Sequence, residues 1–227
     1  GYYCTEGYVN SWDVSLNIEG EIFATYNGGI SWISIFTNNF YGGHSYMFYK
    51  FHKVENSSLY ILGNSTALGG PFTAMIMEFD LLNSTDNVIW HGQGSAVAYD
   101  SYSYSSNSFT IVSGTSINGG GIFWGTHINT EVSGGYITSN ANTNGTNLYS
   151  IDMLEANPVN GITVGASGKI YNLTNMLSIN NVITENTSIS PAAELWSVEM
   201  MNDKGWIVGN LGTILFTVDS GQTWSPY

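Results

Sequence analysis

Five glycines recur along the chain at a nearly constant interval, and each is followed two positions later by an apolar residue. They are Gly20, Gly70, Gly120, Gly168 and Gly212, separated by 50, 50, 48 and 44 residues. Upstream of the last two, Leu148–Met153 and Leu195–Met200 align residue for residue, with apolar and polar positions alternating. Such alternation is typical of half-buried strands, and its repetition indicates a β-structure built from similar units.

The length of the repeat narrows the fold further. Four-stranded blades of a β-propeller run about 40–50 residues, which matches the spacing of the glycines. We therefore predict an all-β fold, a single β-propeller domain over 1–227 with about five four-stranded blades. The first blade is the weakest, because Gly1–Val9 has a poor pattern for an inner strand. The approximate blade boundaries are 1–40, 45–92, 95–140, 146–190 and 193–227.

A Val-Gly-x-x-Gly pattern marks a turn in the last two units, at Val164–Gly168 and Val208–Gly212. Two glycines around a two-residue turn favour a hairpin, because glycine reaches positive φ without strain. We expect this hairpin to join the second and third strands of a blade.

The charge of the chain excludes several classes of partner. Four basic residues, all lysine, stand against 17 acidic ones, for a net charge of −13. Nucleic acid and anionic lipid both require clustered Lys or Arg, so we expect neither as a partner.

No apolar run approaches the roughly 18 residues that span a membrane, so we expect no membrane insertion. A surface rich in Asn, Ser, Thr and Tyr fits acid-tolerant surroundings, and equally an ordinary secreted protein.

Several features favour a location outside the cell, on a cell or virion surface. Six Asn-x-Ser/Thr sequons are candidate glycosylation sites in an exported protein. Cys4 is the only cysteine, so no disulfide forms within the chain. It is either a small buried side chain or half of an interchain disulfide. A chain that opens at Gly1 is explained equally by processing or by a fragment. The sequons are Asn56, Asn64, Asn83, Asn144, Asn172 and Asn186.

The last unit contains Thr217-Val-Asp-Ser-Gly-Gln-Thr-Trp224, and the first contains Thr25-Tyr-Asn-Gly-Gly-Ile-Ser-Trp32. Both resemble the Asp-box of bacterial-neuraminidase-type repeats, with Asn for Asp and Ser for Thr in the first copy. The wider segment Gly205–Trp224 resembles a blade of the propellers related to the photosystem II assembly factor. Blades two to four lack the box, so the resemblance rests on two copies.

The resemblance implies a structural role for the box, as a hairpin between the third and fourth strands. The Asp side chain accepts hydrogen bonds from turn amides, Gly takes positive φ, and Trp packs between blades. We therefore expect Trp224 and Trp32 to occupy equivalent buried positions. The residues given this role are Thr217, Asp219, Gly221, Trp224, Thr25, Asn27, Gly29 and Trp32.

We predict no catalytic, metal or cofactor site. The resemblance to sialidases, which share the box, implies three arginines that bind the carboxylate of the substrate. This chain has no arginine, so the sialidase reaction is not expected. Other glycosidases need two facing carboxylates, for which Asp152, Glu155, Glu194 and Glu199 are the candidates. Asp152 and Glu199 fall on polar positions of strands that would line a propeller channel. The histidines, His44, His52, His91 and His127, lack metal-ligand spacing.

Tyrosines in two segments are the candidate ligand-binding residues. Asn38–Tyr46 and Tyr99–Tyr104 combine Tyr with Ser, Gly and Asn, and Tyr provides contact area at low entropic cost. The alternative is ordinary packing between blades. The tyrosines that we expect to meet a ligand are Tyr41, Tyr46, Tyr102 and Tyr104.

These patterns favour a non-catalytic extracellular structural or adhesion propeller. It would bind a protein subunit, by self-assembly or within a larger surface complex, or a neutral glycan. A virion appendage, a surface filament or a cell envelope would suit it. One alternative is a protein-binding propeller like the assembly factors, although those typically use a basic face that is missing here. The other alternative is a carbohydrate-active hydrolase that uses channel carboxylates.

Overall fold

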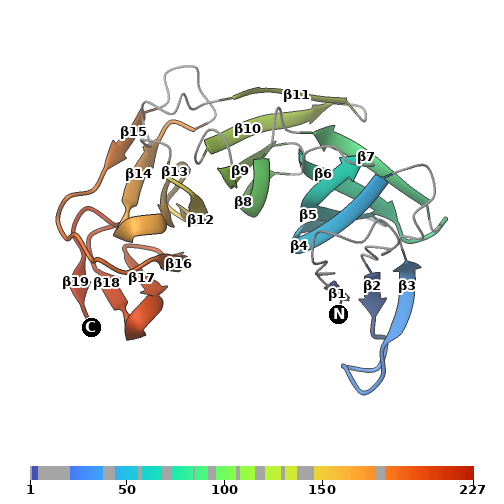
Figure 1. The fold of residues 1–227 in the computed structure, drawn as a ribbon, viewed down its shortest axis with the longest axis horizontal. Coiled ribbons are helices and arrows are strands. Elements are labelled where there is room, and N and C mark those ends of the chain that lie inside the picture. Colours follow the sequence, from blue (N-terminus) through green and yellow to red (C-terminus); the bar gives the residue numbers. More distant parts are fainter. Residues whose placement is uncertain are drawn as a thin grey trace. The chain divides into compact units, whose positions relative to one another are not determined.

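The computed structural model describes residues 2–4, 21–37, 44–55, 58–67, 73–83, 85–91, 96–105, 108–115, 121–128, 131–136, 146–176 and 182–227. The chain divides into two compact units, Gly1–Ala98 and Tyr99–Tyr227, and each is described by itself. Figure 1 shows the described residues as short strands gathered into sheets, with each sheet built from consecutive strands.

The first unit holds two antiparallel sheets. One has three strands in the order β1-β2-β3, and the other has four in the order β4-β5-β6-β7 (Figure 1). Ile22 of the first sheet is buried with Phe48, Leu59 and Phe79 of the second, so a shared apolar core joins the two sheets. The strands are β1 (Tyr2–Cys4), β2 (Glu21–Ala24), β3 (Ile33–Thr37), β4 (His44–Glu55), β5 (Ser58–Ala67), β6 (Thr73–Asp80) and β7 (Thr85–His91).

The second unit contains three four-stranded sheets, each ordered as the strands follow in the chain. The first is β8 (Ala96–Ser105), whose first three residues belong to the other unit, with β9 (Ser108–Thr115), β10 (Gly121–Ile128) and β11 (Glu131–Tyr136). The second is β12 (Leu148–Leu154), β13 (Asn157–Gly165), β14 (Ile170–Thr174) and β15 (Val182–Glu185). The third is β16 (Leu195–Met201), β17 (Lys204–Gly209), β18 (Ile214–Thr217) and β19 (Ser225–Pro226). Two apolar clusters join neighbouring sheets of this unit.

The sequence correctly predicted a mostly β fold of antiparallel sheets. The sheets lie within the predicted blade boundaries except that β4 begins at His44, one residue before 45–92, and the sheet in 1–40 has three strands among the described residues. A single five-bladed propeller over 1–227 stays a prediction at this point. Besides strands, the described residues form two short 3₁₀ turns, η1 (Ala166–Gly168) and η2 (Asn210–Gly212).

The two Val-Gly-x-x-Gly turns are hairpins, but their two glycines serve different purposes. Gly168 and Gly212 adopt φ values of 68° and 72°, which the sequence predicts. Gly165 is instead extended, at φ −169°. A Cβ there would collide with the carbonyl oxygen of Asn147, so the first glycine is required for the close approach of the preceding strand.

The hairpins Thr217–Trp224 and Thr25–Trp32 share one hydrogen-bond pattern. The Thr217 hydroxyl donates to Oδ1 of Asp219 (2.7 Å) and accepts from the amide of Gly221 (3.1 Å). The Thr25 hydroxyl does the same with Asn27 (3.0 Å) and Gly29 (2.8 Å). The two hairpins therefore share one local geometry, although Thr217–Trp224 joins the third and fourth strands of its sheet and Thr25–Trp32 joins β2 and β3, the second and third described strands of the first sheet.

The predicted equivalence of the two tryptophans is wrong in its burial. Trp224 is 3% exposed, whereas Trp32 is 43% exposed. Trp224 is buried because it packs with Ile162 and its neighbours on the preceding sheet. Trp32 instead lies on an exposed hairpin, in which Tyr26 and Ile30 are also largely exposed.

Candidate functional site

Three aromatic side chains form a row across the second unit, one from the first strand of each sheet. Tyr99 of β8 meets Tyr149 of β12 edge to face, with ring centroids 5.3 Å apart. Tyr149 in turn stacks on Trp196 of β16, at 4.4 Å between centroids and 22° between ring planes. We call these three residues the aromatic row.

Hydrogen bonds fix the last member of the aromatic row in place. The Trp196 indole Nε1 donates to Oδ1 of Asn210 (2.7 Å), and Nδ2 of Asn210 donates to Oε2 of Glu194 (3.3 Å). Trp196 is nevertheless 45% exposed. The indole is thus a rigid aromatic surface that is open to solvent and has a carboxylate nearby, and such a surface suits contact with a ligand.

The tyrosine at the centre of the row remains neutral. Burial raises the pKa of Tyr149 above its ordinary value, and the Glu194 carboxylate raises it further, while a hydrogen bond with Asn147 acts in the opposite direction. Its ordinary pKa is already about 10, so the hydroxyl keeps its proton throughout the neutral range. The row therefore offers aromatic faces and neutral polar groups.

The buried carboxylate of Asp100 links strands that carry the aromatic row by hydrogen bonds. Asp100 of β8 accepts hydrogen bonds from the Ser150 hydroxyl (2.8 Å) and the Ile151 amide (3.1 Å) of β12. The Ser150 hydroxyl also accepts from the amide of Val198 on β16 (3.3 Å). One short chain of hydrogen bonds therefore links the three strands that carry the aromatic row.

Asp152, a candidate catalytic carboxylate, has a similar structural role. Its Oδ2 accepts from the amide of Met200 on β16 (2.6 Å), and its Oδ1 accepts from the amide of Met153 (2.8 Å). Glu199 lies exposed on β16. Both carboxylate oxygens of Asp152 are thus bonded to backbone amides, and the bond to Met200 links β12 to β16.

Of the four tyrosines predicted to bind a ligand, Tyr102 is the one whose side chain the structure describes, so a shared site stays a prediction. Tyr102 packs beside the cluster around Leu148 and Ile151, and burial, followed by Asp152 and Glu155, raises its pKa. It is a partly buried packing residue rather than an open contact. Tyr46 and Tyr104 lie on β4 and β8, but their side chains fall outside the description, as does the whole of Tyr41.

The sequons also divide by environment. Asn64 is fully buried, which leaves no room for a glycan and argues against this predicted acceptor. The amide nitrogen of Asn186 donates to the carbonyl oxygens of Gly221 (2.8 Å) and Gln222 (3.1 Å), and Asn172 donates to Gly221 (3.4 Å). Asn83 is exposed on a turn. Asn56 and Asn144 lie outside the described residues.

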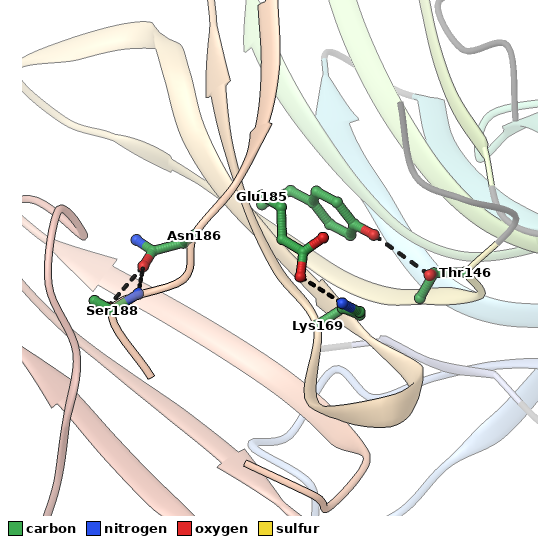
Figure 2. Close-up of polar contacts among 6 residues, drawn as sticks. Thr146, Lys169, Glu185, Asn186 and Ser188 are labelled. Atoms are coloured by element: carbon green, nitrogen blue, oxygen red, sulfur yellow. Dashed lines mark hydrogen bonds and ion pairs between the residues drawn. The ribbon is translucent and has the colours of Figure 1, made fainter. Parts of the chain in front are cut away.

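The contacts of Asn186 hold two sheets together. Its Oδ1 accepts from the amide (3.0 Å) and hydroxyl (2.7 Å) of Ser188, as Figure 2 shows. The Ser188 hydroxyl also accepts from the Trp224 amide (3.1 Å). Together with the bonds to Gly221 and Gln222, these anchor the Thr217–Trp224 hairpin, so we assign Asn186 a structural role.

Positive charge is scarce where the structure describes the chain. Lys169 forms an ion pair with Glu185 (Figure 2), whose hydrogen bond raises the pKa of the lysine. Within the described ranges no three His, Cys, Asp or Glu side chains cluster as metal ligands would. In the same ranges no helix has the length and apolar character needed to cross a membrane.

The sequence analysis missed the aromatic row, although the sequence contained a signal for it. Tyr149 and Trp196 occupy the same position in the two segments that align residue for residue, Leu148–Met153 and Leu195–Met200. Tyr99 begins the aromatic segment Tyr99–Tyr104. An aromatic residue repeated at one position of successive first strands indicates a row across sheets, which attention to single loops does not reveal.

Comparison with known proteins gives a likeness in structure only. No protein-family model matches the chain, and no curated protein matches its sequence. Among solved structures, YCF48 bound to D1 peptide is 17% identical with a TM-score of 0.59, and the match covers 92% of this chain and 63% of that one. YCF48 from Cyanidioschyzon merolae is 10% identical with a TM-score of 0.58, covering 92% and 64%. The chain spans just under two thirds of the length of both, and the likeness shows that its fold is of the β-propeller type.

Proposed function

We propose that this chain is a non-catalytic, protein-binding propeller of the assembly-factor type, and that it holds a segment of its partner on the aromatic row. The aromatic row is the observation that carries the proposal. Rigid Tyr and Trp side chains at a solvent-open surface are the groups that contribute most to protein recognition. The similar fold of YCF48, one example of which is bound to D1 peptide, supports a peptide as the occupant.

We propose a protein-binding propeller of the assembly-factor type rather than an extracellular adhesion propeller. YCF48 is a photosystem II assembly factor with a propeller fold. Within the proposal, the five sheets are blades of one propeller and the hairpins Thr25–Trp32 and Thr217–Trp224 are Asp-boxes. A location outside the cell remains part of it, because the low charge and the Asn-rich surface fit secretion.

The chemistry of the aromatic row defines the partner segment that we propose. Trp196 offers one indole face, Tyr149 stays neutral, and the Glu194 carboxylate is close enough to raise the pKa of Tyr149. An extended segment with an apolar or aromatic side chain stacks on such a surface, and its backbone amides can donate to Glu194. The non-catalytic part of the proposal rests on Asp152, whose carboxylate is bonded to two backbone amides.

A binding measurement with matched variants tests the proposal. The probes are the D1 peptide and a displayed library of peptides, with affinity measured by calorimetry for the best binder. We expect Trp196→Ala to weaken binding at least about tenfold, as for a central interface aromatic. Tyr26→Ala is the control, because Tyr26 is an exposed aromatic outside the row. Equal affinity for the wild-type chain and Trp196→Ala, with unchanged melting temperatures, would refute this function.

A neutral glycan is the other occupant that an open indole face favours. A soluble neutral oligosaccharide that binds with the same dependence on Trp196, while no peptide binds, would replace the protein partner by a carbohydrate. The same binding measurement therefore distinguishes a peptide from a glycan, and Trp196→Ala shows for either ligand whether the aromatic row binds it.

A further inference from the structure

The four sequons whose asparagine the structure describes have different surroundings, and one of them lies in a turn between two strands. Asn83 ends the turn that joins β6 to β7, and it is exposed together with Leu82. The sequon is Asn83-Ser-Thr85, and Thr85 is the first residue of β7, where it pairs with Asp80. In a secreted protein, a sequon on a surface turn is the usual acceptor of an N-linked glycan.

The core of the first unit determines which side of this turn faces solvent. Leu81 packs against the buried cluster that contains Ile22 of the first sheet and Phe79 of the second. The next residue, Leu82, is 79% exposed. The inner side of the turn is thus occupied by the apolar core of its own unit, and Leu82 and Asn83 lie on the outer side.

The hydrogen bonds of Asn83 stay within the turn. Oδ1 of Asp80 accepts from the amides of Leu82 (2.8 Å) and Asn83 (3.2 Å). Nδ2 of Asn83 donates to Oδ2 of Asp80 (2.8 Å). This bond uses one of the two hydrogens on Nδ2. Because a glycan replaces one hydrogen of that nitrogen, the turn can keep its bond to Asp80 after modification.

Asn186 differs because both hydrogens of its side-chain nitrogen are engaged. Its Nδ2 donates to the carbonyl oxygens of Gly221 (2.8 Å) and Gln222 (3.1 Å). The same nitrogen also donates to Oδ1 of Asn172 (3.1 Å). Three acceptors share two hydrogens, so a glycan on Asn186 would remove bonds that anchor the Thr217–Trp224 hairpin.

The other two described sequons are closed to a glycan by packing. Asn64 is fully buried. Asn172 lies on β14, which is paired on both sides, and its Nδ2 donates to the Gly221 carbonyl oxygen (3.4 Å). A glycan on Asn172 would therefore stand where the hairpin of the next sheet contacts β14.

We propose that Asn83 carries an N-linked glycan, and that Asn64, Asn172 and Asn186 stay unmodified in the folded protein. The inference rests on the export that is part of the proposed function. The donor is an oligosaccharide joined through a phosphate to a membrane lipid. Nδ2 of Asn83 attacks the anomeric carbon of the first sugar and loses a proton. The new C–N bond forms as the bond from that carbon to the phosphate oxygen breaks, and the lipid phosphate leaves.

Peptide mapping of the whole chain, secreted from eukaryotic cells behind a cleavable signal sequence, tests the proposal. Removal of glycans by peptide-N-glycosidase in heavy-oxygen water converts each occupied asparagine to labelled aspartate. We expect the label at Asn83 and none at Asn64, Asn172 or Asn186. Thr85→Ala should remove the glycan and Thr85→Ser should keep it, because the sequon requires a hydroxyl at its third position.

Two matched variants separate modification from folding. Asn83→Gln should lose the mass of the glycan and keep the wild-type melting temperature, whereas Asn186→Gln should keep that mass and melt at a lower temperature. An unlabelled Asn83 would overturn the proposal, and so would label at Asn64, Asn172 or Asn186 in the folded protein. Peptide binding to the aromatic row is measured on the same samples by calorimetry, so the glycan and the proposed function can fail independently.

Discussion

Asp219 and Asn27 hold the same position in two hairpins, and together they show what that position requires. Oδ1 of Asp219 accepts from the Thr223 amide (2.9 Å), and Oδ1 of Asn27 accepts from the Ser31 amide (3.0 Å). Oδ2 of Asp219 accepts from the Thr223 hydroxyl (2.6 Å), whereas Nδ2 of Asn27 donates to the Ser31 hydroxyl (2.8 Å). The hairpin thus needs one oxygen acceptor, and the charge is optional.

This comparison predicts the pH dependence of the hairpin. Desolvation raises the pKa of Asp219, but hydrogen bonds from Thr223, Thr217 and Gln222 outweigh it, so the pKa lies below its ordinary value. A carboxylate with a lowered folded-state pKa stabilises the protein above its unfolded pKa, near 4, and loses that contribution as pH falls through the folded pKa. We expect Asp219→Asn to change stability by less than about 1 kcal/mol at pH 7 and to remove this acid-dependent loss.

Thermal unfolding of the wild type and of Asp219→Asn at pH 7 and pH 3 measures this loss. The quantity compared is the decrease in stability from pH 7 to pH 3, which should be larger for the wild type than for Asp219→Asn. Asp219→Ala is the matched variant that loses the acceptor as well, and we expect it to cost about 1–2 kcal/mol at pH 7. If Asp219→Asn is as unstable as Asp219→Ala at pH 7, the charge is needed after all.

Trp224 combines a well-packed ring with an unsatisfied polar atom. Its Nε1 is buried, and no residue in the described part of the chain accepts a hydrogen bond from it. Trp224→Ala should cost about 3–5 kcal/mol because it leaves a cavity between two sheets. Trp224→Phe should cost less than half as much, since it keeps an aromatic ring and removes the unsatisfied N–H. Denaturant unfolding measures both, and equal losses would indicate that the N–H has a partner.

At the scale of the elements, the Val-Gly-x-x-Gly hairpins depend on their first glycine for space. A Cβ at Gly165 would collide with the Asn147 carbonyl oxygen, and one at Gly209 with that of Glu194. We expect Gly165→Ala to force β12 and β13 apart at this end and to cost about 1–3 kcal/mol, as overpacking does. Urea unfolding measures the loss.

The control lies in the same turn. Ser167 has a φ of 58°, which glycine adopts without strain, so Ser167→Gly should be neutral or slightly stabilising. A large loss from Ser167→Gly would show that the turn is fragile for another reason. A neutral Gly165→Ala would show that the strands can separate without cost.

The sequence predicted the elements better than the contacts between them. Alternation along Leu148–Met153 and the repeated glycines located the sheets, because strand periodicity is a local property. The link from Asp100 to Ser150 joins residues 50 positions apart and depends on how sheets pack, which no local pattern encodes. The different burial of Trp224 and Trp32 has the same origin, since identical local hairpins face different neighbours.

At the scale of the whole molecule, the charge predicts how the chain recognises a partner. Four lysines are set against 17 acidic residues, and Lys169 is already paired with Glu185. Acidic side chains that carry contacts, such as Asp100 and Asp152, use them on backbone amides or hydroxyls of the protein itself. We therefore predict that recognition on the aromatic row depends on neutral contacts rather than on ion pairs.

The salt dependence of binding tests this conclusion for any peptide or glycan that binds the aromatic row. Screening acts only on charges, so affinity should change by less than about threefold between roughly 50 mM and 1 M salt. The association rate should be that of an unsteered encounter, about 10⁵–10⁶ M⁻¹s⁻¹, because no electrostatic attraction accelerates it. Calorimetry gives the affinities, and stopped-flow measurement of the change in tryptophan fluorescence on binding gives the rates. A tenfold loss of affinity across that range would show that charge drives recognition. Because lysines are so few, the responsible groups would then be acidic side chains near the row, such as Glu194.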